Sequence, residues 1–309
     1  MTNTSILTWL LFGAVILALL FVDLFVVHRK PHVVKLREAL LVSGGWIAIS
    51  LLFNVWIYFS RGRTAGLDFL TAYFVEKSLS IDNIFLFIVI FRAFQIKAAA
   101  QHRVLYYGVL GALVLRAAFV LGGVALLDRF HFLEYVFGGF LILVAARMIF
   151  ETVDIEHSKP NWQVRMARKW LRVAPEDAGT KMIVHRSGKW FATPLLLALI
   201  AVELSDIIFA VDSVPAVLAI TRDPFIAYSS NAFAILGLRS LYFALAHILP
   251  RFRYIHQGLA VVLAFVGTKM LLSDKFTIPN GISLAVICGI LAIAALASRL
   301  ITGKKSTSS

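Results

Sequence analysis

The 309-residue chain has a single cysteine, Cys288, and few charged side chains for its length. One cysteine excludes a disulfide within the chain and any site that needs paired cysteines. Charged residues make up 15% of the chain and hydrophobic residues 60%, a balance that excludes an ordinary soluble domain. The sequence also lacks a nucleophile elbow, a phosphate-binding loop, an HExxH helix and a GxGD protease motif. We therefore do not expect an enzyme.

Nine apolar runs are long enough to cross a hydrocarbon core of about 30 Å. They cover residues 6–27, 39–60, 67–91, 104–127, 132–150, 191–220, 225–249, 255–272 and 282–301. The sequence therefore predicts an all-α, polytopic membrane protein with about nine transmembrane helices and the lipid bilayer as its surroundings. The first run has no basic residue before it and no small-residue cleavage site after it, so we expect a retained helix rather than a signal peptide.

Lysine and arginine residues concentrate in alternate loops, with 19 in one set of loops and 5 in the other. Because cytoplasmic loops near membrane helices carry the positive excess, this pattern predicts an N-terminus outside the cell and a cytoplasmic C-terminus. It also accounts for the net charge of +13. No basic stretch is interleaved with an aromatic RNA-binding pattern, so nucleic acid is not expected as a partner. The long basic loop, residues 151–190, predicts an interfacial helix starting at Pro160 and a hairpin over residues 182–191.

Five carboxylates lie inside two of the apolar runs. An acidic side chain at the centre of a membrane helix costs roughly 2.5 to 3.5 kcal/mol, so these acids indicate a compensating cation, proton or ion pair. The ligands nearby are oxygens, and the eight histidines lie in loops or near helix ends. Oxygen ligands favour hard divalent ions such as Mn²⁺, Mg²⁺ and Ca²⁺ over Cu⁺ and Zn²⁺. The predicted metal ligands are Glu76, Asp82, Glu203, Asp206 and Asp212, supported by Ser78, Asn83, Ser205, Ser213, Arg116 and Arg239.

The two supporting arginines leave two interpretations open. Arg116 and Arg239 could form structural ion pairs with the acids, or they could balance the charge of the metal-free site. Asp23, close to the end of the first run, is interpreted as an ordinary interfacial acid. Metal ions bind ionised carboxylates, so metal and proton occupancy exclude one another. This is the minimal chemistry of a cation/proton antiporter, in which the metal is a transported substrate and no cofactor is permanently bound.

The third to fifth runs resemble the sixth to eighth. Glu76 and the following Leu-Ser-Ile-Asp match Glu203 and the following Leu-Ser-Asp, while Arg116 matches Arg239. Two copies of a three-helix unit enter the membrane in opposite directions, which gives an inverted repeat. The predicted segments are residues 1–66 with two helices and a basic cytoplasmic loop, 67–150 as repeat 1, 151–190 as the cytoplasmic loop, 191–274 as repeat 2, and 275–309 as the last helix and tail.

The spacing of the acids also predicts broken helices. Asp82 and Asp212 each lie six residues from another acid, about 120° away around an uninterrupted helix. Pro215 removes a backbone hydrogen bond near Asp212. The run over residues 191–220 is also too long for a straight perpendicular span. We therefore expect discontinuous helices in the third and sixth runs.

Residues 75–83 (VEKSLSIDN) and 202–216 (VELSDIIFAVDSVPA) together resemble the paired signature of the TerC family. The resemblance covers nearly the whole chain, including residues 108–111 and 233–239. It implies a bacterial inner-membrane protein that exports manganese, with the motif acids carrying the metal, and the family is also associated with tellurite resistance. Some members are described as assembly factors or redox modulators. The competing interpretation is therefore a non-transporting membrane scaffold or a stress and redox modulator.

Overall fold

The computed structural model describes residues 4–23, 36–130, 132–150, 181–186, 189–248, 255–272 and 278–305, and almost all of them are helical. The helices are α1 (Ile6–Val22), α2 (Leu36–Arg61), α3 (Arg63–Ala93), α4 (Ala98–Arg129), α5 (Leu133–Phe150), α7 (Pro194–Leu218), α8 (Pro224–Leu236), α9 (Leu238–Ile248), α10 (Ile255–Leu271) and α11 (Asn280–Lys305). Each of the nine predicted runs contains a helix, and the seventh contains two. The all-α class is confirmed.

The side chains are distributed as a bilayer requires. Four described helices are long and apolar enough to span a membrane, namely α2, α7, residues 100–129 and residues 281–298, and α1, α8 and residues 257–271 are shorter apolar helices. Large apolar side chains point outward, and Phe59 is 82% exposed, whereas Glu76 and Arg116 are each 1% exposed. Polar groups inside and apolar groups outside identify a multi-pass membrane protein.

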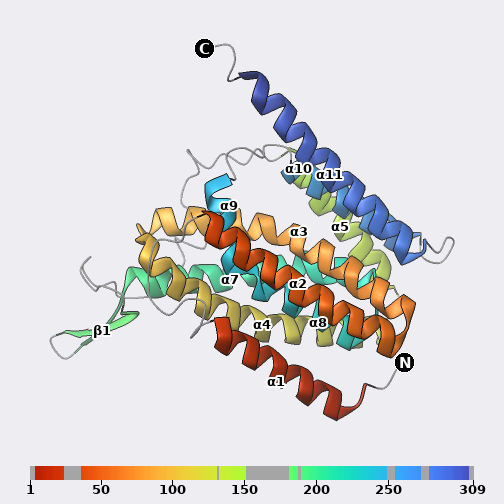
Figure 1. The fold of residues 1–309 in the computed structure, drawn as a ribbon, viewed down its shortest axis with the longest axis horizontal. Helices are drawn as coiled ribbons and strands as arrows, with labels where there is room; N and C mark the ends of the chain where they lie inside the picture. The colour runs from red at the N-terminus through yellow and green to blue at the C-terminus, as the bar shows by residue number, and fades with distance from the viewer. Residues whose placement is uncertain are drawn as a thin grey trace.

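Helix α8, in which almost every residue is buried, packs against both α3 and α4 (Figure 1). Helix α3 packs against α2, α7 and α8, and α4 packs against α7 and α8. Helix α5 packs on α10, where Gly138 and Gly267 face each other so closely that a Cβ on either residue would lie within 3.0 Å of the other's carbonyl oxygen. Small residues allow helix backbones to approach in this way in membranes.

Helices α2 and α3 are joined by a one-residue turn. The residue between them, Gly62, has a φ of 91°, a backbone conformation that favours glycine. In Figure 1, helix α1 begins at the right of the view, whereas α11 ends at the upper left and the hairpin lies at the far left. The start of α1 and the end of α11 therefore lie at opposite ends of the bundle.

The expectation of discontinuous third and sixth spans is wrong. Helix α3 runs unbroken from Arg63 to Ala93, and α7 runs unbroken from Pro194 to Leu218 with Pro215 inside it. The sixth run looked too long because five of its residues lie outside the helix: residues 191 and 192 in a β-strand, Thr193 as the N-cap, and residues 219 and 220 after the last turn. The remaining 25 residues of α7 make a helix of about 37 Å, which crosses a hydrocarbon core with some tilt.

The break lies in the seventh run instead. Helix α8 ends at Leu236, Gly237 follows with φ −82° and ψ 0°, and α9 starts at Leu238. A Cβ at position 237 would lie 2.6 Å from Nζ of Lys77 and 3.2 Å from Cβ of Trp46. The glycine therefore leaves room for the Lys77 ammonium, which donates a 3.3 Å hydrogen bond to the carbonyl oxygen of Ala234 in the last turn of α8. The positive charge of Lys77 is stabilised there by the negative, C-terminal end of the α8 helix dipole.

The predicted hairpin is confirmed. Strands β1 (Ile183–Arg186) and β2 (Lys189–Ala192) pair antiparallel, with Arg186 opposite Lys189. Thr193 follows directly as the N-cap of α7, and its hydroxyl accepts a hydrogen bond from the backbone N–H of Leu196. The interfacial helix predicted from Pro160 lies outside the described residues.

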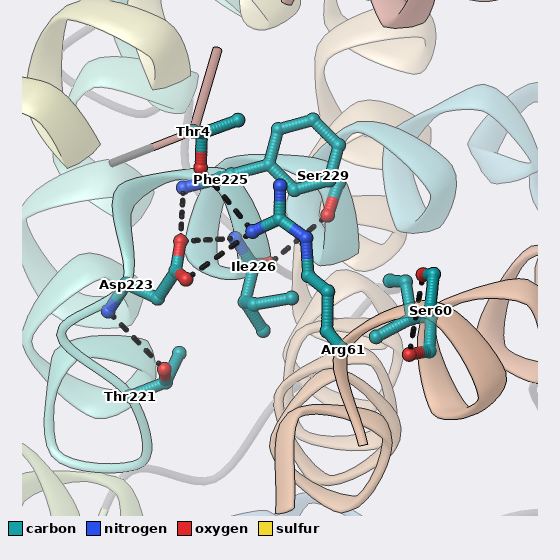
Figure 2. Close-up of polar contacts among 9 residues, drawn as sticks. Thr4, Ser60, Arg61, Thr221, Asp223, Phe225, Ile226 and Ser229 are labelled. Atoms are coloured by element: carbon teal, nitrogen blue, oxygen red, sulfur yellow. Dashed lines mark hydrogen bonds and ion pairs between the residues drawn. The ribbon is translucent and has the colours of Figure 1, made fainter. Parts of the chain in front are cut away.

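One end of the bundle is held by Arg61 at the last turn of α2 (Figure 2). Its Nη1 donates to Oδ2 of Asp223 at 3.3 Å and to Oγ1 of Thr4 at 3.2 Å, while the guanidinium carbon lies 4.4 Å from the centre of the Phe225 ring. Oδ1 of Asp223 caps α8 by accepting hydrogen bonds from the backbone N–H groups of Phe225 and Ile226. The single Asp223 carboxylate thus serves both the ion pair and the helix cap.

The two roles of Asp223 predict different stabilities for two substitutions. Asp223→Ala loses the cap and the ion pair, and we expect it to lower the free energy of unfolding by about 1 kcal/mol or more. Asp223→Asn keeps a capping oxygen and should cost less, because a partly exposed ion pair contributes about 1 kcal/mol at most. Thermal unfolding of the purified variants in detergent measures both. Equal losses would contradict the capping role.

Candidate cation site

Two of the five predicted acids meet in the interior of the bundle at Arg116. Nη1 of Arg116 on α4 donates to Oε1 of Glu76 on α3 and, at 2.8 Å, to Oδ1 of Asn231 on α8. Nη2 of the same side chain lies 3.6 Å from Oδ1 of Asp206 on α7. All four side chains are buried, with exposures between 0% and 3%. One guanidinium therefore links four helices and bridges two carboxylates.

This cluster is incompletely satisfied. Oε2 of Glu76, Oδ2 of Asp206 and Nε of Arg116 are buried and make no hydrogen bond. The Ser213 hydroxyl is also buried; it lies near the Glu76 carboxylate but forms no hydrogen bond of regular geometry. Buried polar atoms normally have partners, and a fixed ion pair is stable only when its remaining atoms are satisfied. Three of these unpartnered atoms are oxygens, the ligand type of hard divalent cations.

The third predicted acid, Glu203, takes a neighbouring position. It lies three residues before Asp206 on α7, and its carboxylate occupies the space above Gly111 of α4, where a Cβ would collide with it. Glu203 is half-buried and lies close enough to Asp206 for the two acids to interact electrostatically. Among the described side chains, no three histidine, cysteine or acidic residues form a group that could hold a metal ion.

The last two predicted acids are placed only by their backbones. Asp82 lies on α3 and Asp212 on α7, each within an unbroken helix, and their side chains are outside the described part of the structure. The metal-binding role of the five acids therefore stays a prediction.

The supporting hydroxyls and amide have different surroundings. Ser78 and Ser205 donate to carbonyls one turn earlier in their own helices, Phe74 and Ala201, at 2.6 Å each. Asn83 is buried in α3. Only Ser213, of these four, lies beside the Arg116 cluster with its hydroxyl unpartnered.

Arg239 lies apart from the Arg116 cluster and binds the end of α1. Its Nη2 is 2.8 Å from Oδ2 of Asp23 and donates to the Asp23 carbonyl oxygen at 3.0 Å. Both side chains are buried, at 3% and 8% exposure. Asp23 is therefore not an exposed acid, as an ordinary interfacial one would be, because it is buried in an ion pair with Arg239. For Arg239, the structural ion pair is the arrangement observed.

Sequence reasoning missed Asn231, which is fully buried and accepts a hydrogen bond from Arg116. Its side chain also donates to the Ala227 carbonyl at 3.0 Å. The available signal was an amide inside an otherwise apolar run, because an amide in a membrane helix marks an interhelical hydrogen bond. That signal does not identify the partner, Arg116, which lies on another helix, α4.

Removing the positive charge of Arg116 from this cluster should lower the stability of the folded protein. Arg116→Gln leaves two buried carboxylates without a counter-charge, and we expect a loss of about 3–5 kcal/mol in the free energy of unfolding. Adding Glu76→Gln and Asp206→Asn to the same chain removes the uncompensated charges and should restore most of the loss. Thermal unfolding of the single and triple variants tests this. A triple variant less stable than Arg116→Gln would contradict the expectation.

The sequence was compared with known proteins. The profile of the "Integral membrane protein TerC family" matches residues 61–306. The chain is 47% identical over 290 residues to "Uncharacterized membrane protein STKORF319" of Myxococcus xanthus, which covers 94% of this chain and 91% of that protein. It is 43% identical over 294 residues to "Putative membrane-bound redox modulator Alx" of Escherichia coli K12, with 92% of each chain covered. No solved structure shows significant similarity. The chain belongs to the TerC family of integral membrane proteins.

Proposed function

We propose that the chain is a transporter that moves Mn²⁺, a hard divalent cation, out of the cytoplasm in exchange for protons. The observation that carries this proposal is the pair of buried acids at Arg116, because Glu76 and Asp206 come from different helices and each retains an unpartnered buried oxygen. Ionisable residues inside a membrane bundle mark ion pathways by default. Ser213 adds a third unpartnered oxygen at the same place.

The proposal extends to Asp82 and Asp212. Asp82 follows Glu76 by six residues on α3, and Asp212 follows Asp206 by six residues on α7. Each pair is separated by about 9 Å along its helix axis. Because both helices are unbroken, the two acids of each pair lie about 120° apart around the helix, so we assign Asp82 and Asp212 to separate positions along the path rather than to the Arg116 cluster. We assign Glu203 to the same path, since it lies one turn before Asp206. A series of weak oxygen sites allows a cation to enter and to leave.

The inverted repeat belongs to this proposal and is supported by the packing. Helix α3 packs on α8 as α4 packs on α7, which is the exchange expected if α3 corresponds to α7 and α4 to α8. Inverted repeats place substrate sites near the midplane, where the copies meet.

The orientation in the membrane follows from charge. The hairpin over residues 183–192 lies at the end of the long basic segment, and its end of the bundle is also the end at which α11 finishes (Figure 1). By the positive-inside rule this end faces the cytoplasm, which leaves the start of α1 outside. For a bacterial cell this describes a protein of the inner membrane.

A non-transporting redox modulator is the second candidate, favoured by the printed name of the Alx relatives. A thiol–disulfide cycle within one chain needs two cysteines, and this chain has only Cys288. The Arg116 cluster offers no redox group of its own. A modulating effect on redox state would therefore arise indirectly, through the metal content of the cell.

The role of Asp206 is tested by expressing the chain in cells that lack their own manganese exporter. We expect the wild-type chain to lower cellular manganese and to protect against added Mn²⁺, and Asp206→Asn to lose both effects because the site loses a ligand charge. Asp223→Asn, a change of the same chemistry at the end of the bundle, serves as the control. The measurements are cellular manganese content and growth at equal membrane abundance. Protection by Asp206→Asn equal to wild type would refute the site.

A further inference from the structure

Arg116 occupies the place that a metal ion would have to take between Glu76 and Asp206. Its two terminal nitrogens contact one oxygen of each carboxylate, so the guanidinium sits where a single cation could be shared by both. We propose that Arg116 is a tethered cation that competes with the metal substrate for these two carboxylates. This inference rests on the proposed function. It adds a residue whose guanidinium alternates with the metal ion at the carboxylates of Glu76 and Asp206.

The charges explain why the two cations exclude each other. With both acids ionised, the described cluster of Glu76, Asp206, Arg116 and Asn231 carries one excess negative charge. A divalent ion placed beside the guanidinium would face a like charge in a site that excludes water, where repulsion is weakly screened. With the guanidinium moved away, the two carboxylates match the charge of the divalent ion. Metal binding therefore requires Arg116 to leave at least one carboxylate.

The guanidinium of Arg116 does not bind both carboxylates equally closely. Its contact with Asp206 is 3.6 Å, an ion-pair distance longer than a hydrogen bond, and its Nε has no partner. Arginine recognises a carboxylate best through two parallel hydrogen bonds. Here it reaches neither acid in that way, because only one nitrogen contacts each of them.

Asn231 offers a partner that Arg116 can retain. Its amide oxygen accepts from Nη1 at 2.8 Å and carries no charge, so it does not compete for the metal as a carboxylate does. Asn231 lies on α8, the helix that ends at the Gly237 break. A movement of Arg116 toward Asn231 therefore changes a contact with α8, the first helix of the broken seventh span. In the metal-free state the guanidinium returns and closes the site.

Metal-dependent stability tests this inference directly. Full-length wild type, Arg116→Gln and Arg116→Lys are purified in detergent and titrated with MnCl₂, and the midpoint of thermal unfolding is recorded at each concentration. We expect Arg116→Gln to be less stable than wild type without metal and to bind Mn²⁺ at least ten-fold more tightly, so that Mn²⁺ restores its stability. Arg116→Lys should be intermediate, because one ammonium cannot bridge both carboxylates.

Lys269→Gln is the matched control. It removes another intramembrane cation, whose Nζ donates to Oγ of Ser283 at 3.0 Å outside the cluster, and its Mn²⁺ affinity should stay within two-fold of wild type. If wild type binds Mn²⁺ and neither Arg116 variant binds it more tightly, the inference fails while the proposed function stands. If neither wild type nor Arg116→Gln responds to Mn²⁺, the proposed function fails and the inference fails with it.

Discussion

The buried guanidinium of Arg116 is the interaction on which the centre of this bundle depends. It projects from α4 and contacts side chains of α3, α7 and α8, so a single group fixes the relative position of four helices. In a bilayer the hydrophobic effect does not drive helices together, and close packing and interhelical polar contacts do. The Gly138–Gly267 approach between α5 and α10 supplies the first kind of contact, and the Arg116 cluster supplies the second.

The polar contacts of the bundle fall into two groups that differ in completeness. At one end, Arg61 is satisfied by Asp223, Thr4 and the Phe225 ring. At the centre, the acids and Arg116 keep unpartnered buried atoms. The contacts of Arg61 hold that end of the framework together. Under the proposed function, the incomplete contacts at the centre are the place where a cation is exchanged.

Hydropathy predicted the position of every described helix, with α8 and α9 sharing one run, because the bilayer imposes a similar length and composition on each span. The hairpin at residues 183–192 was also predicted, from its turn and aromatic residues. The break at Gly237 was not, since it depends on the approach of Lys77 and Trp46 from other helices. The acids of the site could be named from sequence, but their pairing could not. The partners Asp206 and Asn231 lie 90 and 115 residues from Arg116, and only packing brings them there.

The central claim is that the carboxylates at Arg116 carry Mn²⁺ across the membrane against protons. The most direct measurement is the flux of radioactive Mn²⁺ into or out of proteoliposomes under an imposed pH gradient, for wild type and for Glu76→Gln. The account predicts wild-type flux that follows the direction of the proton gradient and disappears in Glu76→Gln. Correctly inserted, folded wild-type protein that carries no Mn²⁺ in either direction would contradict it.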